Sequence, residues 1–254
     1  SISGILQADE AERILMATNV RGGLIVHLGC GNGRLTTALR AGDGYVVHGL
    51  DKSEKNVHIA REYVRSQGLY GDVAIDLQKG TTLPYADNLV NLLLVEEAMG
   101  ISREEMLRVL APGGSLYRSE SDGWEMLVKP RSTNIDEWTH HLHGPDGNPV
   151  SKDDVVGPPR HIQWTAGPEW ARSHGYTPSV TSMVSSNGRF FTIVDETLAG
   201  ASDAVPSKWM LVARDAFNGV LLWKKPIPNW GAYEMSGLAD SGAGISVGRF
   251  TMPP

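Results

Sequence analysis

The stretch Gly23-Leu-Ile-Val-His-Leu-Gly-Cys-Gly-Asn-Gly33 decides the fold. Its first half, Leu24 to Leu28, is short and apolar, which predicts a buried strand. Gly29, Gly31 and Gly33 then follow at alternate positions. Glycines allow positive φ angles and let a ligand approach the bare main chain, so this turn is a candidate binding site.

A helix and a second strand are expected after the turn, in the order of a nucleotide-binding unit. Arg34 to Arg40 predicts the helix, whose N-terminal N–H groups and dipole favour an electronegative ligand. Asp51 closes the apolar run Tyr45 to Leu50, about 20 residues after the turn, where nucleotide folds place an acid against ribose hydroxyls. Glycine turns occur in many loops, so a tight structural turn is the alternative.

Over residues 8–120 the chain resembles class I S-adenosylmethionine-dependent methyltransferases. The resemblance rests on four motifs: His27-Leu-Gly-Cys-Gly-Asn-Gly33, Gly49-Leu-Asp51, Leu83-Pro-Tyr-Ala-Asp-Asn88 and Leu107-Arg-Val-Leu-Ala-Pro-Gly-Gly114. It implies S-adenosylmethionine as the cofactor and an unidentified methyl acceptor, which we expect to be a small molecule.

The resemblance also implies which residues bind the cofactor. Gly29 to Gly33 would hold its methionine and ribose parts, Asp51 its ribose hydroxyls, and Gln78 to Gly80 would lie near the adenine. The full set of candidate cofactor-binding residues is His27, Gly29, Cys30, Gly31, Asn32, Gly33, Asp51, Lys52, Gln78, Lys79 and Gly80.

Two positions depart from the family pattern. Family members often carry an acid two residues before the first glycine, where it meets the methionine ammonium, but His27 stands there and offers no fixed negative charge. Lys79 stands where an acid is frequent on the adenine side. The alternative to a methyltransferase is therefore a non-catalytic nucleotide-binding or scaffold protein.

Helices and strands alternate through the first 130 residues. Residues 8–17 predict a helix with Asp9 as its N-cap, and Ser53 and Ser102 are expected to cap two more helices. Strands are expected at residues 72–77, 89–95 and 115–118. Such alternation with short connections predicts an α/β fold with a Rossmann-like, doubly wound, mostly parallel sheet. The continuous apolar run 89–95 should be central in it.

The carboxyl ends of parallel strands meet at one edge of the sheet, where ligands bind in such folds. Glu96 and Glu97 follow the strand 89–95 and so join the glycine turn and Asp51 there. We take Glu96 as the candidate catalytic residue on the acceptor side, with a solvated strand end as the alternative. Methyl transfer needs mainly the alignment of acceptor and methyl group, and a base only where the acceptor loses a proton.

We expect residues 1–130 to form the methyltransferase-like domain and residues 131–254 a linker followed by β repeats. The later segment is rich in Trp, Pro, Gly, Ser and Thr, which suits strands and turns. Hairpins are predicted at residues 180–194, around Asn187-Gly188, and at residues 209–224.

The second hairpin resembles a blade of a quinoprotein (PQQ-like) β-propeller. A closed propeller needs about four blades or more, so we expect only a partial propeller and a chain that is a fragment of a longer protein. A quinoprotein-like oxidoreductase activity is a third hypothesis. Unclosed hairpins leave strand edges through which a homodimer could form.

The linker contains Trp138-Thr-His-His-Leu-His143. On a strand, His141 and His143 would share one face, which is an acceptable spacing for a metal. Aromatic packing and turn hydrogen bonds are the simpler explanation, so no metal is assigned to His140, His141 or His143. His27 and His48 are expected to be hydrogen-bonded core residues.

Composition narrows the function classes. The net charge of −6 and the pI near 5.7 argue against nucleic-acid binding. Cys30 is the one cysteine, which excludes an internal disulfide. No apolar run approaches the length of a membrane span. An active methyltransferase would favour the cytoplasm, whereas a leader before Ser1 would favour export.

Overall fold

The computed structural model describes residues 2–155, 157, 162–167, 180–198 and 205–228. The chain divides into two compact units, one of residues 1–165, 184–191 and 213–223, and the other of residues 166–183, 192–212 and 224–254. Among the described residues, no helix is both long and apolar enough to span a membrane.

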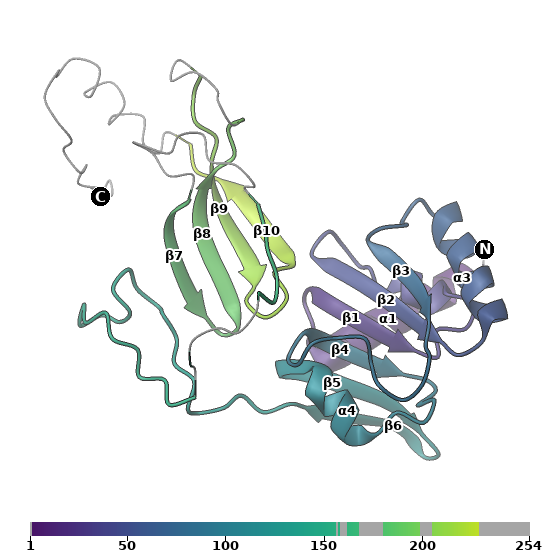
Figure 1. The fold of residues 1–254 in the computed structure, drawn as a ribbon. Helices are drawn as coiled ribbons and strands as arrows, with labels where there is room; N and C mark the ends of the chain where they lie inside the picture. Colours follow the sequence, from purple (N-terminus) through teal and green to yellow (C-terminus); the bar gives the residue numbers. More distant parts are fainter. Residues whose placement is uncertain (1, 156, 158–161, 168–179, 199–204, 229–254) are drawn as a thin grey trace, which may run out of the picture. The chain divides into compact units, whose positions relative to one another are not determined.

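A six-stranded sheet forms the body of the first unit, in the order β3-β2-β1-β4-β5-β6 (Figure 1). Its strands are β1 (Gly23–Leu28), β2 (Tyr45–Asp51), β3 (Val73–Leu77), β4 (Val90–Val95), β5 (Leu110–Glu120) and β6 (Gly123–Val128). The first five strands are parallel, as predicted, and β4 is central. β6 adds an antiparallel edge strand beside β5, which the hydrophobic pattern alone does not predict.

Helices cover both faces of this sheet. α1 (Ile2–Thr18), α2 (Arg34–Ala38) and α3 (Glu54–Ser66) pack on one face, and α4 (Arg103–Val109) packs on the other. The central strands supply both cores because successive side chains point to opposite faces. In β4, for example, Leu92 and Leu94 join the first core and Leu93 joins the second.

The predicted start of the first helix is wrong. α1 begins at Ile2, so Asp9 lies inside the helix and is not its N-cap. Asp9 and Glu12 have the spacing of a capping box, but the helix continues upstream of them as far as Ile2.

The other two predicted N-caps are confirmed. The Ser53 hydroxyl accepts a hydrogen bond from the Asn56 N–H group, and the Ser102 hydroxyl accepts one from the Glu105 N–H group. Gly68 follows α3 with a φ of +70°, a left-handed conformation that commonly terminates helices.

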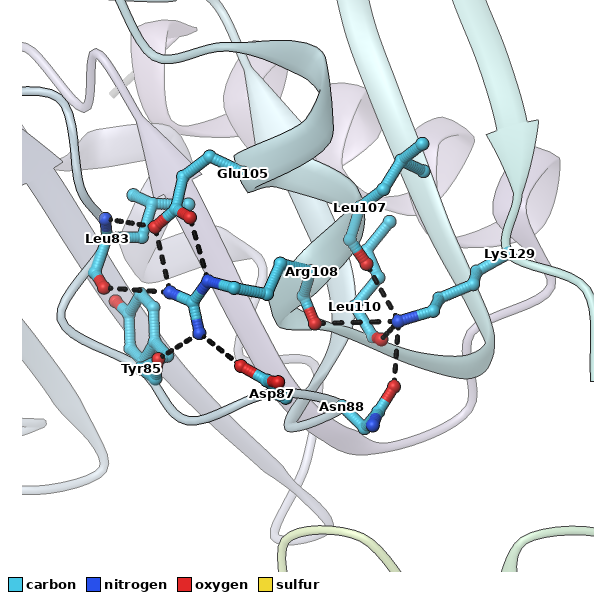
Figure 2. Close-up of polar contacts among 9 residues, drawn as sticks. All are labelled: Leu83, Tyr85, Asp87, Asn88, Glu105, Leu107, Arg108, Leu110 and Lys129. Atoms are coloured by element: carbon cyan, nitrogen blue, oxygen red, sulfur yellow. Dashed lines mark hydrogen bonds and ion pairs between the residues drawn. The ribbon is translucent and has the colours of Figure 1, made fainter. Parts of the chain in front are cut away.

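Arg108 fastens the loop between β3 and β4 to α4 (Figure 2). Its guanidinium donates two hydrogen bonds to the Glu105 carboxylate, at 2.7 and 2.8 Å. It also donates to the carbonyl oxygen of Tyr85 at 2.9 Å and to Asp87 at 2.7 Å. Glu105 in turn accepts the Leu83 N–H group at 2.7 Å. These bonds hold the loop that follows the end of β3.

Lys129 performs a similar task at the C-terminal end of α4 (Figure 2). Its amine donates to the carbonyl oxygens of Leu107 and Leu110, each at 2.8 Å, and to the Asn88 side chain at 2.7 Å. The last carbonyls of a helix have no partner within the helix, so a cation is favourable there. Burial lowers the pKa of Lys129.

A second sheet has the order β10-β9-β8-β7. β7 (Val180–Ser186) and β8 (Arg189–Asp195) are joined by Asn187 and Gly188, whose φ angles of +51° and +68° suit a tight hairpin turn. β9 (Trp209–Asp215) and β10 (Leu221–Pro226) form a second hairpin. Both predicted hairpins are confirmed. In the described part of the chain they make one four-stranded sheet and no closed ring.

The linker histidines lie in a turn and not on a strand, so the shared face that a metal site would need is not formed. His140 and His143 face each other across a tight turn, and His143 has a φ of +68°. The His143 Nε2 atom lies 2.5 Å from Asp136 Oδ2, and the pKa of Asp136 falls to about 2 because the Lys152 N–H group and His143 both bond its carboxylate. Within the described ranges, no three His, Cys, Asp or Glu residues are grouped so as to hold a metal.

We predict that Glu105→Gln destabilises the protein by about 1–2 kcal/mol, because charge-assisted hydrogen bonds to Arg108 and Leu83 are weakened. The bonds to Arg108 lower the pKa of Glu105. Its contribution is therefore present above the unfolded glutamate pKa of about 4.3 and is lost as the pH falls through the lower folded value.

Urea unfolding of both proteins at pH 7 and pH 3.5 tests this, and the difference between them should shrink at the lower pH. Glu62→Gln is the control, because Glu62 pairs with Arg65 on the surface and should contribute less than about 0.5 kcal/mol. Equal losses for the two variants at pH 7 would contradict the prediction.

Candidate functional site

The carboxyl ends of β1, β2 and β4 bring most of the candidate residues together. β1 lies between β2 and β4, so the glycine turn that follows β1 has Asp51 on one side and Glu96 on the other. The Gly29 N–H group donates to the Leu50 carbonyl at 2.8 Å, and the Glu96 N–H group donates to the Leu28 carbonyl at 3.0 Å. The turn is therefore fixed to both neighbouring strands.

The three glycines of the turn have different surroundings, although all have positive φ angles. A Cβ atom at Gly29 would lie 2.9 Å from the Glu97 backbone nitrogen, and one at Gly33 would lie 2.8 Å from the Ala60 Cβ. A Cβ atom at Gly31 would meet only the Gly29 carbonyl oxygen, at 4.0 Å. Gly29 and Gly33 are thus required by packing, whereas Gly31 faces open space.

Most N–H groups of the turn already have partners. Those of Gly29 and Cys30 donate to the Leu50 carbonyl, and that of Arg34 donates to the Asn32 side chain at 3.1 Å. α2 is only five residues long. The helix N-terminus therefore offers a ligand less than the sequence predicts.

The Asp51 carboxylate faces the glycine turn. It accepts hydrogen bonds from the N–H groups of Gly31 at 3.0 Å and Ser53 at 2.8 Å. The Asn56 amide nitrogen lies 3.2 Å from each carboxylate oxygen. Asp51 is only 4% exposed, so a ligand that bonds it must approach from the turn.

The remaining candidates on this side lie along the ends of β2 and β3. The Lys52 amine forms an ion pair with Glu97, which follows β4. Gln78 is buried, and its side-chain amide donates to the carbonyl oxygens of Gly80 at 3.3 Å and Thr82 at 2.9 Å. Gln78 thus shapes the turn after β3, whereas Lys79 next to it is exposed.

His27 connects the core with the edge of the sheet. It is completely buried, and its Nδ1 atom lies 2.9 Å from the Thr36 hydroxyl. Its Nε2 atom lies 3.3 Å from Glu96 Oε2 but lacks the geometry of a hydrogen bond, so it is a buried nitrogen without a hydrogen-bond partner among the described residues. A carboxylate only accepts hydrogen bonds, so a bond to Glu96 would require a proton on Nε2, and Nδ1 could then accept one from the Thr36 hydroxyl.

Cys30 is buried within the turn. Burial and, to a smaller extent, the nearby Asp51 charge raise the pKa of its thiol to about 12. The residue is therefore a protonated thiol at neutral pH, and it does not have the low pKa of a nucleophilic cysteine.

Comparison with known proteins identifies the type of domain around this site. Residues 25–114, which contain the glycine turn, Asp51 and Glu96, match the family model described as "Methyltransferase domain". The site lies in a methyltransferase-type domain. The description of this model names neither the methyl donor nor the acceptor.

Two curated relatives share this part of the sequence. "Methyltransferase GfsG" from Streptomyces halstedii is 34% identical over 125 residues, which cover 46% of this chain and 45% of the relative. A ubiquinone/menaquinone biosynthesis C-methyltransferase, UbiE, from Yersinia pestis bv. Antiqua is 28% identical over 141 residues, which cover 52% and 55%. The chain spans about half the length of these relatives.

Among solved structures, a SAM-dependent methyltransferase from Aquifex aeolicus is similar, with 24% identity and a TM-score of 0.39. The similarity covers 44% of this chain and 66% of that one.

Three observations in the methyltransferase-type domain fit S-adenosylmethionine. Gly31 leaves open space above the main chain, and the Asp51 carboxylate faces the same turn. His27 Nε2 is a buried nitrogen that lacks a hydrogen bond, and it lies beside the half-exposed Glu96 carboxylate. The site therefore contains acceptors for hydroxyl groups and an anion for an amino group.

Sequence reasoning missed Thr36 and Asn56, which orient His27 and Asp51. Each is the third residue of the helix that follows a motif strand, and that position in the first helical turn is the signal that could have found them. It also missed a series of hydrogen-bonded side chains on β2, β3 and the loop that follows β3. The Tyr85 hydroxyl lies 2.7 Å from His48 Nδ1, and His48 Nε2 lies 3.0 Å from Asp76. Both core histidines are hydrogen-bonded, as predicted.

A separate groove of about 600 Å³ lies at the other end of the strands. Tyr45, the first residue of β2, borders it, whereas Asp51 is the last residue of that strand. Its lining residues are Ala8, Glu12, Leu15, Met16, Asn19, Val20, Arg21, Ala38, Ala41 and Tyr45. The groove is therefore distinct from the candidate cofactor site.

Gly29→Ala should destabilise the protein more than Gly68→Ala. Both glycines have left-handed φ angles, +78° and +70°, so an alanine at either position loses about 1–2 kcal/mol from backbone strain. Only at Gly29 does the new methyl group meet a neighbouring main chain, and this overpacking should add about 1–3 kcal/mol. Urea unfolding of the two variants gives the comparison, and equal losses would refute the packing argument.

Cys30 should resist alkylation in the folded protein. Because its thiol is buried and its pKa is about 12, iodoacetamide at pH 8 should label it at less than about one hundredth of the rate seen in urea. Mass spectrometry of the intact chain measures the label directly, since Cys30 is the only cysteine. Rapid labelling without urea would show that the turn opens.

Proposed function

We propose that this chain is an S-adenosylmethionine-dependent methyltransferase that acts on a small-molecule acceptor. The observation that carries the proposal is the convergence of the open Gly31, the Asp51 carboxylate and Glu96 at one edge of a parallel sheet. In open α/β sheets, ligands bind at this edge. The similarity to an enzyme named as a ubiquinone/menaquinone biosynthesis C-methyltransferase supports a small acceptor.

The cofactor would be held by residues from the ends of three strands. Asp51 would accept hydrogen bonds from the ribose hydroxyls, and the turn from Gly29 to Gly33 would bring bare main chain against the ligand. Gln78 would shape the adenine end through its bonds to Gly80 and Thr82. The other candidate cofactor-binding residues are sequence neighbours of these groups: His27, Cys30, Asn32, Lys52 and Lys79.

The bound cofactor would supply a methyl group on a positively charged sulfur, and the departing thioether is neutral. The residues of this chain therefore need to bind and orient the two reactants and to exclude water. A general base is required only if the acceptor loses a proton during transfer. From the sequence, Glu96 is the candidate catalytic residue on the acceptor side, and in the structure its carboxylate lies beside His27.

We further propose that residues 131–254 form a separate domain with propeller-like repeats. An aspartate at the end of one strand in each hairpin supports a repeat. Asp195, at the end of β8, accepts the N–H groups of Thr197 and Lys208. Asp215, at the end of β9, accepts those of Phe217 and Asn218. An aspartate thus closes the turn after β8 and again after β9.

Wild-type protein should bind S-adenosylmethionine and S-adenosylhomocysteine, and Asp51→Asn should weaken both by about 10- to 100-fold. A hydrogen bond to a charged group contributes about 1.5–3 kcal/mol, and the amide keeps the size of the side chain. Isothermal titration calorimetry measures the affinities. Asp76→Asn is the control, because Asp76 is not a candidate cofactor-binding residue and pairs with Arg61 and His48 at the sheet edge.

Transfer itself is tested with radiolabelled methyl donor and a panel of small-molecule acceptors. No heat of binding to wild-type protein at millimolar ligand would overturn the proposal. Binding without transfer to any acceptor would instead favour a non-catalytic binding domain.

A further inference from the structure

Three carboxylates lie beside the glycine turn, and they differ in what they can still bind. Asp51 already receives hydrogen bonds from three donors and is almost completely buried. Glu97 is neutralised by its ion pair with Lys52. The Glu96 side chain is 41% exposed, and its ionic neighbour is the buried His27. Glu96 is therefore the carboxylate that is free to receive a cation from a ligand.

Two buried side chains, Thr36 and His27, lead from α2 to the Glu96 carboxylate. Thr36 on α2 bonds His27 Nδ1 at 2.9 Å, and His27 Nε2 on the other side of the ring lies 3.3 Å from Glu96 Oε2. Both Thr36 and His27 are 0% exposed. The main chain of Glu96 is also fixed, because its N–H group bonds the Leu28 carbonyl. The main chain of Glu96 is thus fixed next to the glycine turn, and its carboxylate lies beside His27 and remains 41% exposed.

The hydrogen-bond geometry between His27 and Glu96 is incomplete. Nε2 is a buried nitrogen that finds no hydrogen bond among the described residues, and leaving such a group unpaired costs free energy. A rotation of the Glu96 side chain that brings Oε2 into hydrogen-bond geometry with Nε2 would complete this bond, and the second carboxylate oxygen would remain for a ligand. A cation bound to that oxygen would favour the rotated position.

We propose that Glu96 is the anion that binds the ammonium group of the cofactor's methionine part, and that His27 is its positioning residue. The proposal rests on the proposed function, since it assigns one contact of the same cofactor. It gives Glu96 a role in cofactor binding in place of the acceptor-side role expected from the sequence. His27 itself cannot supply the charge, because a buried imidazole beside a carboxylate is neutral or positive.

The spacing of the strands supports this assignment. Asp51 and Glu96 follow β2 and β4, which are separated by β1, and neighbouring strands lie about 4.8 Å apart. The two carboxylates thus flank the turn on opposite sides, about 10 Å apart in the plane of the sheet. S-adenosylmethionine carries its hydroxyl groups and its ammonium group on different parts of the molecule. Two separated acceptors suit such a ligand.

The test compares two ligands that differ at the amino-acid end. S-adenosylhomocysteine has the ammonium group, whereas 5′-methylthioadenosine keeps the adenine, ribose and sulfur but lacks it. Calorimetry on the full chain should show that Glu96→Gln weakens binding of S-adenosylhomocysteine by about 10- to 100-fold, as expected for a lost charge-assisted bond. Binding of 5′-methylthioadenosine should change by less than about twofold, because that ligand makes no such bond.

Two further variants give the comparison its controls. Glu62→Gln removes a surface charge that is paired with Arg65, and it should leave both affinities within about twofold. Glu96→Asp keeps the charge on a shorter side chain and should restore part of the affinity for S-adenosylhomocysteine. It also serves as the test variant if Glu96→Gln does not fold, which the melting temperature reports.

The outcomes separate this proposal from the proposed function. If Glu96→Gln weakens both ligands equally, or neither, while the wild-type protein binds both, the assignment of Glu96 is wrong and the site remains a cofactor site. If the wild-type protein binds neither ligand, the proposed function itself fails. Selective loss of S-adenosylhomocysteine binding supports the assignment.

Discussion

The close packing of the Glu97 main chain against Gly29 is the constraint on which the candidate site depends. No side chain fits between these two segments, since even a Cβ atom at Gly29 would lie 2.9 Å from the Glu97 nitrogen. The chain must therefore turn with a positive φ as it leaves β1. Because β1 and β4 pair in register up to Leu28 and Val95, the next residues of both strands are held side by side. The turn and the two glutamates become one structural unit.

Features encoded by neighbouring residues could be predicted from the sequence. The apolar runs gave the parallel strands, because a strand buried on both faces has few polar positions. Ser53 and Ser102 cap helices through bonds to residues only three positions away, and Asn187-Gly188 makes its turn from its own φ angles. These signals are short in range and need no knowledge of the rest of the chain.

The errors arose where distant residues decide the outcome. β6 forms because β5 offers it an unpaired edge, which no local pattern reveals. In the linker, His141 and His143 have a spacing that a strand would place on one face, but the left-handed conformation of His143 and its bond to Asp136 accompany a tight turn. Within the site, the strand order brings Lys52 to Glu97 and Glu96 to His27 across at least 45 positions in the sequence. Residue types identified the participants, and only the fold could pair them.

The histidine in the glycine motif shows why a position should not be judged alone. Near the end of β1, His27 stands where the resemblance implies a negatively charged residue. That difference alone argues against cofactor binding. In the sheet, however, the end of β1 is bordered by the end of β4, and the β1–β4 register sets Glu96 beside the same turn. A ligand responds to the charge present in its surroundings, whichever strand carries it. The buried imidazole then has a purpose of its own, because it can orient the neighbouring carboxylate without competing for the ligand.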